Sequence, residues 1–408
     1  MDYIIIGCGI SGLNIGLKLI NKYPTKNIVI YDKSNYVGGR LYTQTHNINN
    51  KIIQYEAGGA RFNKSHKLLF KLIRNYNLNH KLVKIPNTIN TVFSRKIVSK
   101  YFNSSQEIID ALLSLKLSKK YLMSKTIYEI VTELYDKETA LFLQHSYPYY
   151  TVISFTNAYD ALRAFSSDLD SSSQYYVLGG GISQLIDKMK NDFIKKGGII
   201  KLNHSLDNVK MYKNGFECFF SNKHSKNTEI QCEHLILACD SYSLQKMTFL
   251  KKLNIDLNSV KVLPLLRTYA IYNNSWFEDL GKIVTNESIK YIIPINPKIG
   301  LIMISYTDWK NANFWNKLNK TQQKKELTNQ LRKLFPDRNI EQPKYIFNHY
   351  WKQGVSYWKP NYNSDILTKK IMKPSHYNLY ICGDSYSTKQ AWMEGALESS
   401  TKLFKLYF

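Results

Sequence analysis

Three glycines near the start of the sequence have the spacing of a phosphate-binding loop. They lie in the segment Gly7-Cys8-Gly9-Ile10-Ser11-Gly12, and an acidic residue, Asp32, follows twenty positions after the last glycine. In such a loop the first glycine allows a tight turn, the second lets a pyrophosphate approach the backbone, and the third lets a helix pack closely on a strand. A carboxylate at this distance accepts hydrogen bonds from a ribose. The pattern therefore indicates dinucleotide binding, with Ile10, Ser11 and Lys33 expected beside the ligand.

The residues around this motif predict the elements that would hold it. Residues 2–6 (DYIII) form a short apolar run typical of a buried strand, and Leu13, Leu17 and Ile20 have helical spacing. Residues 27–31 return as a second strand that leads into Asp32. The unpaired N–H groups at the start of the helix would then face the phosphates. Because strand, helix, second strand and acid occur in this order, we favour a dinucleotide site over an ordinary glycine turn.

Further stretches resemble conserved motifs of the flavin-containing amine oxidase family. They are Gly38-Gly39-Arg40 and residues 54–62 (QYEAGGARF), 379–384 (LYICGD) and 392–400 (WMEGALESS). The resemblance implies bound FAD, with its pyrophosphate at the first stretch, its ring beside the second and its ribityl chain at the third. The contacts that it implies are Gly39, Arg40, Gly58, Gly59, Ala60, Arg61, Gly383, Asp384, Trp392, Met393 and Ala396. The family also places an aliphatic residue beside the adenine, which is Leu206 or, as the alternative, Val209.

The same resemblance suggests candidates on the substrate side. Trp392 falls where the family usually has one tyrosine of an aromatic pair around the substrate amine, and its partner would be Tyr357 or Trp358. A tryptophan face can attract a cation in this way. Arg267 stands where many members have a lysine. Arginine is not a base at neutral pH, so Arg267 would either orient an anionic group or pair structurally.

The fold that we expect is α/β, with a Rossmann-like, doubly wound FAD-binding domain and an interleaved α+β substrate domain. The FAD-binding domain would be discontinuous and comprise residues 1–64, 175–260 and 375–408. Residues 65–174 and 261–374 would form the substrate-binding domain. Residues 351–358 lie where some family members attach flavin through a cysteine, and they contain none, so non-covalent FAD is expected.

Composition and charge limit the partners. The net charge is +25, but the lysine pairs are spread along the chain, so specific nucleic-acid binding is not expected. No apolar run approaches the length of a membrane span, and Asp2 occupies a place where a signal peptide carries positive charge, so an intracellular, cytoplasmic protein is expected. The abundance of Asn, Lys, Ile and Tyr suggests an AT-rich genome; for a large DNA virus, the place would be the host cytoplasm or the virion. The five cysteines form no C-x-x-C pair, which argues against a metal site. The sequence leaves the oligomeric state open.

The function that these observations predict is an FAD-dependent oxidoreductase. It would oxidise the C–N bond of a small-molecule amine by hydride transfer to flavin N5, and oxygen would reoxidise the flavin to give hydrogen peroxide. One alternative is a desaturase or porphyrinogen-type oxidase that acts on an anionic or apolar substrate. The net charge of +25 and Arg267 suit an anionic substrate better than a polyamine. Another alternative is a flavoprotein without turnover.

Overall fold

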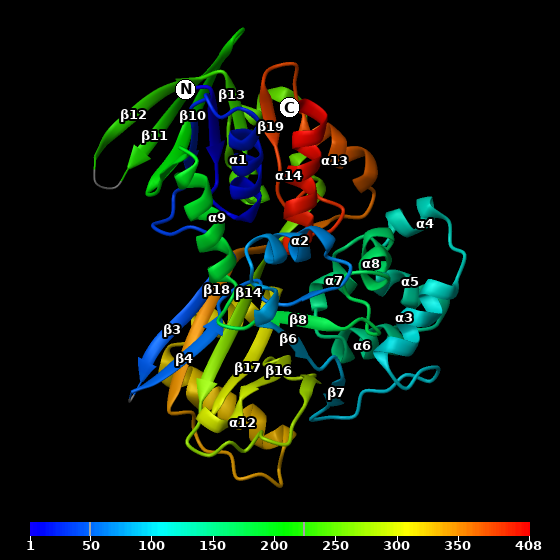
Figure 1. The fold of residues 1–408 in the computed structure, drawn as a ribbon. Helices are drawn as coiled ribbons and strands as arrows, with labels where there is room; N and C mark the ends of the chain where they lie inside the picture. The colour runs from blue at the N-terminus through cyan, green and yellow to red at the C-terminus, as the bar shows by residue number, and fades with distance from the viewer. Residues whose placement is uncertain (49, 223–224) are drawn as a thin grey trace. The chain divides into compact units, whose positions relative to one another are not determined.

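The computed structural model describes residues 1–48, 50–222 and 225–408, which fall into two compact units (Figure 1). Unit 1 comprises residues 1–85, 174–261 and 363–408, and unit 2 comprises residues 86–173 and 262–362. The boundaries differ from the expected ones because residues 65–85 and 363–374 belong to unit 1. Leu69 and Ile73 of helix α2 (Lys67–Asn75) and Met372 of helix α13 (Ser364–Met372) are buried in its core.

The centre of unit 1 is a parallel sheet with the strand order β19-β13-β1-β2-β9. Its strands are short and come from three separate parts of the chain: β1 (Tyr3–Ile6), β2 (Ile28–Tyr31), β9 (Ile199–Lys201), β13 (His234–Leu237) and β19 (Leu379–Ile381). Every residue of β1, β2 and β19 is buried, as expected for a parallel sheet covered by helices. Helix α1 (Ile10–Lys22) packs against α9 (Ser183–Lys195) and α14 (Met393–Tyr407) (Figure 1).

Three smaller sheets complete unit 1. Strands β3 (Thr43–Ile48) and β4 (Lys51–Glu56) pair antiparallel. Strands β10 (His204–Tyr212), β11 (Gly215–Asn222) and β12 (Ser225–Cys232) form an antiparallel sheet, and β5 (Phe62–Asn63), β8 (Tyr175–Leu178) and β6 (Leu82–Ile85) form another. The remaining helical elements are α10 (Ser241–Lys246), η1 (Asn79–Lys81), η2 (Leu250–Leu253) and η3 (Leu257–Ser259).

Unit 2 contains a six-stranded sheet with the order β18-β14-β17-β16-β15-β7. The strands are β7 (Ile89–Val92), β14 (Val260–Ile271), β15 (Lys282–Thr285), β16 (Tyr291–Asn296), β17 (Leu301–Asp308) and β18 (Tyr345–Trp358). The sheet is mixed, since β15 pairs with β7 in parallel and with β16 antiparallel. The short helix η4 (Pro297–Ile299) precedes β17, and α11 (Trp309–Lys317) and α12 (Lys320–Leu334) contribute buried apolar side chains to its core.

The rest of unit 2 is a helical cluster with its own apolar core. Its helices are α3 (Ser105–Ser114), α4 (Lys119–Ser124), α5 (Ile127–Leu134), α6 (Lys137–Ser146), α7 (Tyr150–Ser154) and α8 (Ala158–Phe165).

Helix α5 illustrates how local sequence sets a helix start. The Thr126 hydroxyl accepts a hydrogen bond from the Glu129 backbone N–H, and the Glu129 carboxylate accepts one from the Thr126 N–H.

Helix α1 of unit 1 starts differently. Its N-cap residue is Gly9, which has no side chain to accept a hydrogen bond, and its first turn contains no acid. The first N–H groups of this helix are therefore left for another acceptor, which is the arrangement that an anion requires.

Among the residues that the structure describes, no helix combines the length and the apolar character needed to cross a bilayer.

Candidate cofactor and active site

Two glycines of the loop between β1 and α1 are required by packing. Gly7 has a φ of +108°, and a Cβ at this residue would lie 2.5 Å from the Ala238 carbonyl oxygen. A Cβ at Gly12 would lie 1.9 Å from the Gly7 carbonyl oxygen. Neither position can accept a side chain without movement of the backbone, so both glycines serve the close fit of strand and helix.

Gly9 differs, because nothing in its own surroundings requires glycine. Its φ of −76° suits any residue, and the nearest atom to a Cβ there would be the Gly38 carbonyl oxygen at 3.9 Å. A side chain would therefore fill free space beside the uncapped start of α1. This is the one position of the motif at which glycine keeps room for a ligand, and it matches the role of a glycine that a pyrophosphate approaches.

Asp32 fixes the same loop from the end of β2. Its Oδ2 accepts a hydrogen bond from the Cys8 N–H at 2.7 Å, and its Oδ1 accepts one from the Ser34 N–H at 2.8 Å. Each carboxylate oxygen has a second lone pair, so the half-buried side chain can still accept hydrogen bonds from a ribose. The neighbouring Lys33 is exposed and donates to the Ser243 hydroxyl at 3.3 Å.

The segment after β2 joins this loop to the last part of the chain. The Gly38 N–H donates to the Cys8 carbonyl at 2.9 Å, and Gly39 follows with a φ of +60°. The Arg40 guanidinium donates to the Asp384 carboxylate at 2.5 Å. Burial alone would lower the pKa of Arg40, but the Asp384 carboxylate outweighs this effect and keeps the arginine charged. A cation and an acid expected at two parts of FAD thus lie together.

Residues 57–61 pack tightly on the backbone of Arg40. A Cβ at Gly58 would lie 1.9 Å from the Arg40 carbonyl oxygen, and one at Gly59 would lie 2.6 Å from Leu41 Cδ2. The Gly59 N–H also donates to the Arg40 carbonyl at 2.9 Å. The protein's own packing thus accounts for Gly58, whereas at Gly59 only the end of the Leu41 side chain would have to move. Ala60 and Arg61 follow as half-buried residues.

Arg61 lies against two aromatic rings. Its guanidinium carbon is 4.9 Å from the centre of the Tyr175 ring and 5.6 Å from the centre of the Trp392 ring. The His66 ring meets the Trp392 ring edge to face, with 5.0 Å between the two centres. Trp392 is half-buried, and a cation already occupies part of its surroundings.

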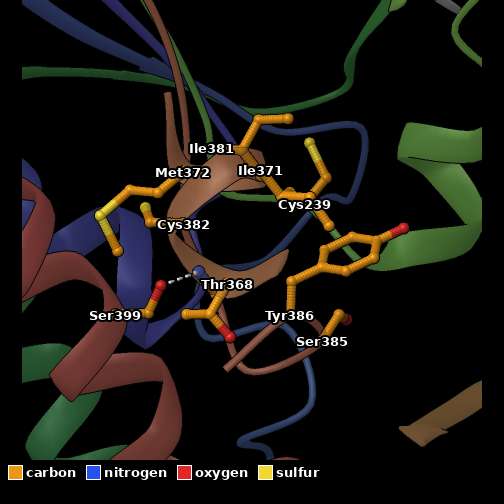
Figure 2. Close-up of a pocket in the computed structure, with 10 residues that line it drawn as sticks. Cys239, Thr368, Ile371, Met372, Ile381, Cys382, Ser385, Tyr386 and Ser399 are labelled. Atoms are coloured by element: carbon orange, nitrogen blue, oxygen red, sulfur yellow. Dashed lines mark hydrogen bonds between the residues drawn. The ribbon is translucent and has the colours of Figure 1, made fainter. Parts of the chain in front are cut away.

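The C-terminal motif forms a turn and a helix start. Gly383 has a φ of +139°, and its N–H donates to the Ser399 hydroxyl at 3.1 Å, the dashed line in Figure 2. Trp392 is the N-cap residue of α14, and both Met393 and Ala396 are buried. The cavity in Figure 2, of about 10 Å³, has room for roughly one water and lies beside the ends of β13 and β19. Its lining includes Cys239, Cys382, Thr368, Ser385 and Ser399.

The two adenine candidates differ in burial. Val209 is a buried residue of β10 that pairs with Cys218 of β11. Leu206 is half-buried at an irregularity where β10 shifts its register against β11. Leu206 therefore has the surface that a base could contact.

The substrate candidates of unit 2 have unlike surroundings. Arg267, half-buried in β14, has its guanidinium carbon 4.6 Å from the centre of the Tyr306 ring. Burial acts to lower the pKa of Arg267, but Tyr306 and Tyr269 outweigh it and raise the pKa. Trp358 is 1% exposed, and its backbone carbonyl accepts from the Asn157 N–H, whereas Tyr357 is half-buried against the helical core. Of the two candidate partners of Trp392, Tyr357 is the one with accessible surface.

Residues 10–402 match the family model of the flavin-containing amine oxidoreductases. The chain belongs to this family. It is 22% identical to achacin of Lissachatina fulica over 501 aligned positions, which cover 100% of this chain and 93% of achacin.

Solved structures confirm the predicted α/β fold of the amine oxidases. A putrescine oxidase with bound putrescine superposes with a TM-score of 0.75 at 14% identity and covers 99% of this chain and 98% of its own. A protoporphyrinogen oxidase-like protein from Exiguobacterium sp. 255-15 superposes with a TM-score of 0.69, with the same identity and coverage. At this identity the likeness shows the fold alone.

This amine oxidoreductase is an FAD-dependent enzyme, and the residues of unit 1 fit its cofactor. The space at Gly9, the uncapped start of α1 and the charge of Arg40 suit a pyrophosphate, and Asp32 suits a ribose. The start of α14 offers a second helix N-terminus, which suits negative charge on a reduced flavin.

Sequence reasoning missed several residues that shape this region. Glu394 is 1% exposed and binds two N–H groups of α2, Tyr175 stacks with Arg61, and His66 packs on Trp392. An acid in the first turn of a predicted helix was the available signal for Glu394. The segments that these side chains meet are distant in sequence, so spacing gave no further indication.

Proposed function

We propose that this protein oxidises the C–N bond of a small-molecule amine, with oxygen as the electron acceptor. The observation that carries the proposal is the half-buried Trp392 ring at the N-terminus of α14, the helix whose start suits a reduced flavin. When bound, FAD supplies the hydride acceptor, flavin N5. Unit 1 is proposed to bind FAD without a covalent link, and unit 2 is proposed to bind the substrate.

The protein's own groups have positioning and electrostatic roles in this proposal. The N–H groups at the start of α14 stabilise negative charge that develops nearby. Trp392 provides half-buried aromatic surface in unit 1, and Tyr357 provides half-buried aromatic surface in unit 2, where Trp358 is buried. Arg267 cannot remove a proton at neutral pH, and a neutral amine that transfers hydride directly needs no protein base.

A second candidate is oxidation of a substrate that carries an anionic group, as a desaturase or a porphyrinogen-type oxidase would perform it. It is favoured by Arg61, whose guanidinium lies 5.6 Å from the Trp392 ring centre. A substrate ammonium beside that ring would be repelled by this cation, whereas an anionic group would be attracted. Arg267 and the net charge of +25 would likewise attract an anionic substrate and repel a cationic one. A flavoprotein without turnover is the third candidate.

The expected place of action is the interior of a cell. This proposal rests on the free thiols, because all five cysteines are unpaired and four of them are buried.

The decisive experiment is the visible spectrum of the purified protein under anaerobic conditions. Released flavin is identified first, and a pool of primary amines, secondary amines, polyamines and amino acids is then added to one sample and a pool of hydroxy acids and porphyrinogens to another. Bleaching by the amine pool supports amine oxidation, and oxygen uptake with peroxide formation then tests the acceptor. Bleaching by the acid pool alone moves the assignment to an anionic substrate. FAD that neither pool bleaches favours the protein without turnover.

A further inference from the structure

Glu394 connects the starts of two helices that flank Trp392. It lies in the first turn of α14 and is 1% exposed. Its Oε1 accepts a hydrogen bond from the Leu68 N–H at 2.8 Å, and its Oε2 accepts one from the Leu69 N–H at 2.9 Å. Both donors belong to the first turn of α2, where N–H groups have no partner within the helix.

Helix α2 depends on this carboxylate because its own sequence supplies no equivalent. Its N-cap residue, His66, makes no side-chain capping hydrogen bond, and its first turn contains no acid. Glu394 therefore caps α2 from another helix. Burial raises the pKa of Glu394, and the two hydrogen bonds from the Leu68 and Leu69 N–H groups counteract this effect only in part.

The segment that Glu394 holds is the one that contacts Trp392. His66, directly before α2, places its ring 5.0 Å from the Trp392 ring centre in an edge-to-face arrangement. Trp392 lies directly before α14, two residues from Glu394. The two contacts therefore close a small ring of interactions, in which Glu394 fixes the start of α2 and the start of α2 holds the tryptophan.

We propose that Glu394 is a positioning residue that sets the orientation of the Trp392 ring by holding residues 66–69. The proposal rests on the proposed function insofar as Trp392 faces the substrate. A buried carboxylate is weak evidence for stability alone, since well-packed apolar residues often serve that purpose as well. Its two oxygens match two adjacent N–H groups, and this match defines the geometry of the helix start.

The test compares Glu394→Gln with Glu398→Gln. Glu398 lies one turn further along α14, is 39% exposed, and pairs with Lys389 at the surface. A glutamine at 394 keeps one acceptor oxygen and turns an N–H₂ group toward an N–H donor. The assay uses a compound from the pools that bleaches the bound flavin. We expect the KM for this compound to rise about tenfold in Glu394→Gln, with little change in the FAD dissociation constant. Glu398→Gln should match the unchanged protein in both.

A double-mutant cycle with Trp392→Ala shows whether Glu394 acts through the tryptophan. If it does, Glu394→Gln has no further effect on KM once the ring is absent, whereas additive effects overturn the proposal. A crystal structure of FAD-loaded Glu394→Gln gives a readout without turnover. The Trp392 ring should leave its edge-to-face contact with His66, and an unmoved ring overturns the proposal even if no amine is oxidised.

His66→Gln provides a second route if Glu394→Gln does not fold. It removes the ring that touches Trp392 while the two hydrogen bonds to Glu394 remain. It should raise KM to a similar extent and release the Trp392 ring. An unchanged KM together with an unchanged ring orientation in this variant overturns the proposal.

Discussion

The Arg40 guanidinium donates a hydrogen bond to the Asp384 carboxylate at 2.5 Å, although 344 positions separate the two residues in the chain. The pair joins the segment after β2 to the turn after β19. Each residue also matches an expected FAD contact, Arg40 at the pyrophosphate and Asp384 at the ribityl chain, so the pair is proposed to hold together the protein segments that bind these two adjacent parts of the cofactor.

Arg40→Lys should weaken FAD binding by about tenfold or more, because a lysine loses the planar fork that suits both a carboxylate and a pyrophosphate. Titration of the apoprotein with FAD measures the effect. Arg338→Lys is the matched control, since Arg338 pairs with Asp279 in unit 2 and its side chain is 30% exposed, as is that of Arg40. Equal losses in the two variants would contradict the assignment of Arg40.

Gly9→Ala and Gly12→Ala should fail in different ways. An alanine at 9 meets no atom closer than 3.9 Å, so this variant should fold and lose FAD affinity by about tenfold or more. An alanine at 12 would place its Cβ 1.9 Å from the Gly7 carbonyl oxygen, so this variant should not accumulate as folded protein. Circular dichroism and flavin content separate the two results. Full FAD affinity in Gly9→Ala would refute the ligand space at this residue.

Lys290 should make stability depend on pH in unit 2. Lys290 lies in the segment that connects β15 to β16, and its buried ammonium group donates to the Gln144 and His145 carbonyls of α6 at 2.9 and 2.8 Å. Burial lowers the pKa of Lys290 to about 7, although Asp308 acts to raise it.

An unfolded chain keeps the ordinary lysine pKa, so between about pH 7 and about pH 10 it binds a proton that the folded chain lacks. The free energy of unfolding should therefore rise with pH in this window, by up to about 1.4 kcal/mol per pH unit relative to Lys290→Met. Urea unfolding of both proteins across the window measures the difference. If the difference in the free energy of unfolding between the unchanged protein and Lys290→Met stays constant with pH, the prediction is wrong.

Trp358→Ala should lower the free energy of unfolding by about 3 to 5 kcal/mol, because the ring is fully buried and its loss leaves a cavity. Tyr357→Ala should cost less, since this side chain is only half-buried. Urea unfolding measures the stability of both variants, and the KM of each variant shows which of the two aromatic residues contacts the substrate. A rise in KM from Tyr357→Ala with no rise from a folded Trp358→Phe is expected.

The sequence predicted what local spacing determines. The loop from Gly7 to Gly12, the strand before it and Asp32 lie within one βαβ unit, and their types specify both conformation and ligand. Other features depend on distant partners. Gly58 was expected beside a flavin ring, and the structure shows a separate reason for this glycine, because a Cβ there would lie 1.9 Å from the Arg40 carbonyl oxygen. Residues 65–85 were expected with the substrate domain, but the buried face of α2 belongs to the core of unit 1. The spacing of apolar residues shows that one face of a helix is buried, but it does not show which domain that face packs against.

The strand order β19-β13-β1-β2-β9 also sets the order in which a newly made chain can fold. Strands β1 and β2 leave the ribosome first, yet the partner of β1 on its other side is β13, and β19 follows only after all of unit 2 has been made. Closing such long loops is slow, and an unpaired strand edge is exposed meanwhile. Unit 2 can therefore be complete while unit 1 still awaits its last strand. Asp384 can join Arg40 only then, so the two residues proposed to contact FAD come together as one of the last events of the chain's synthesis.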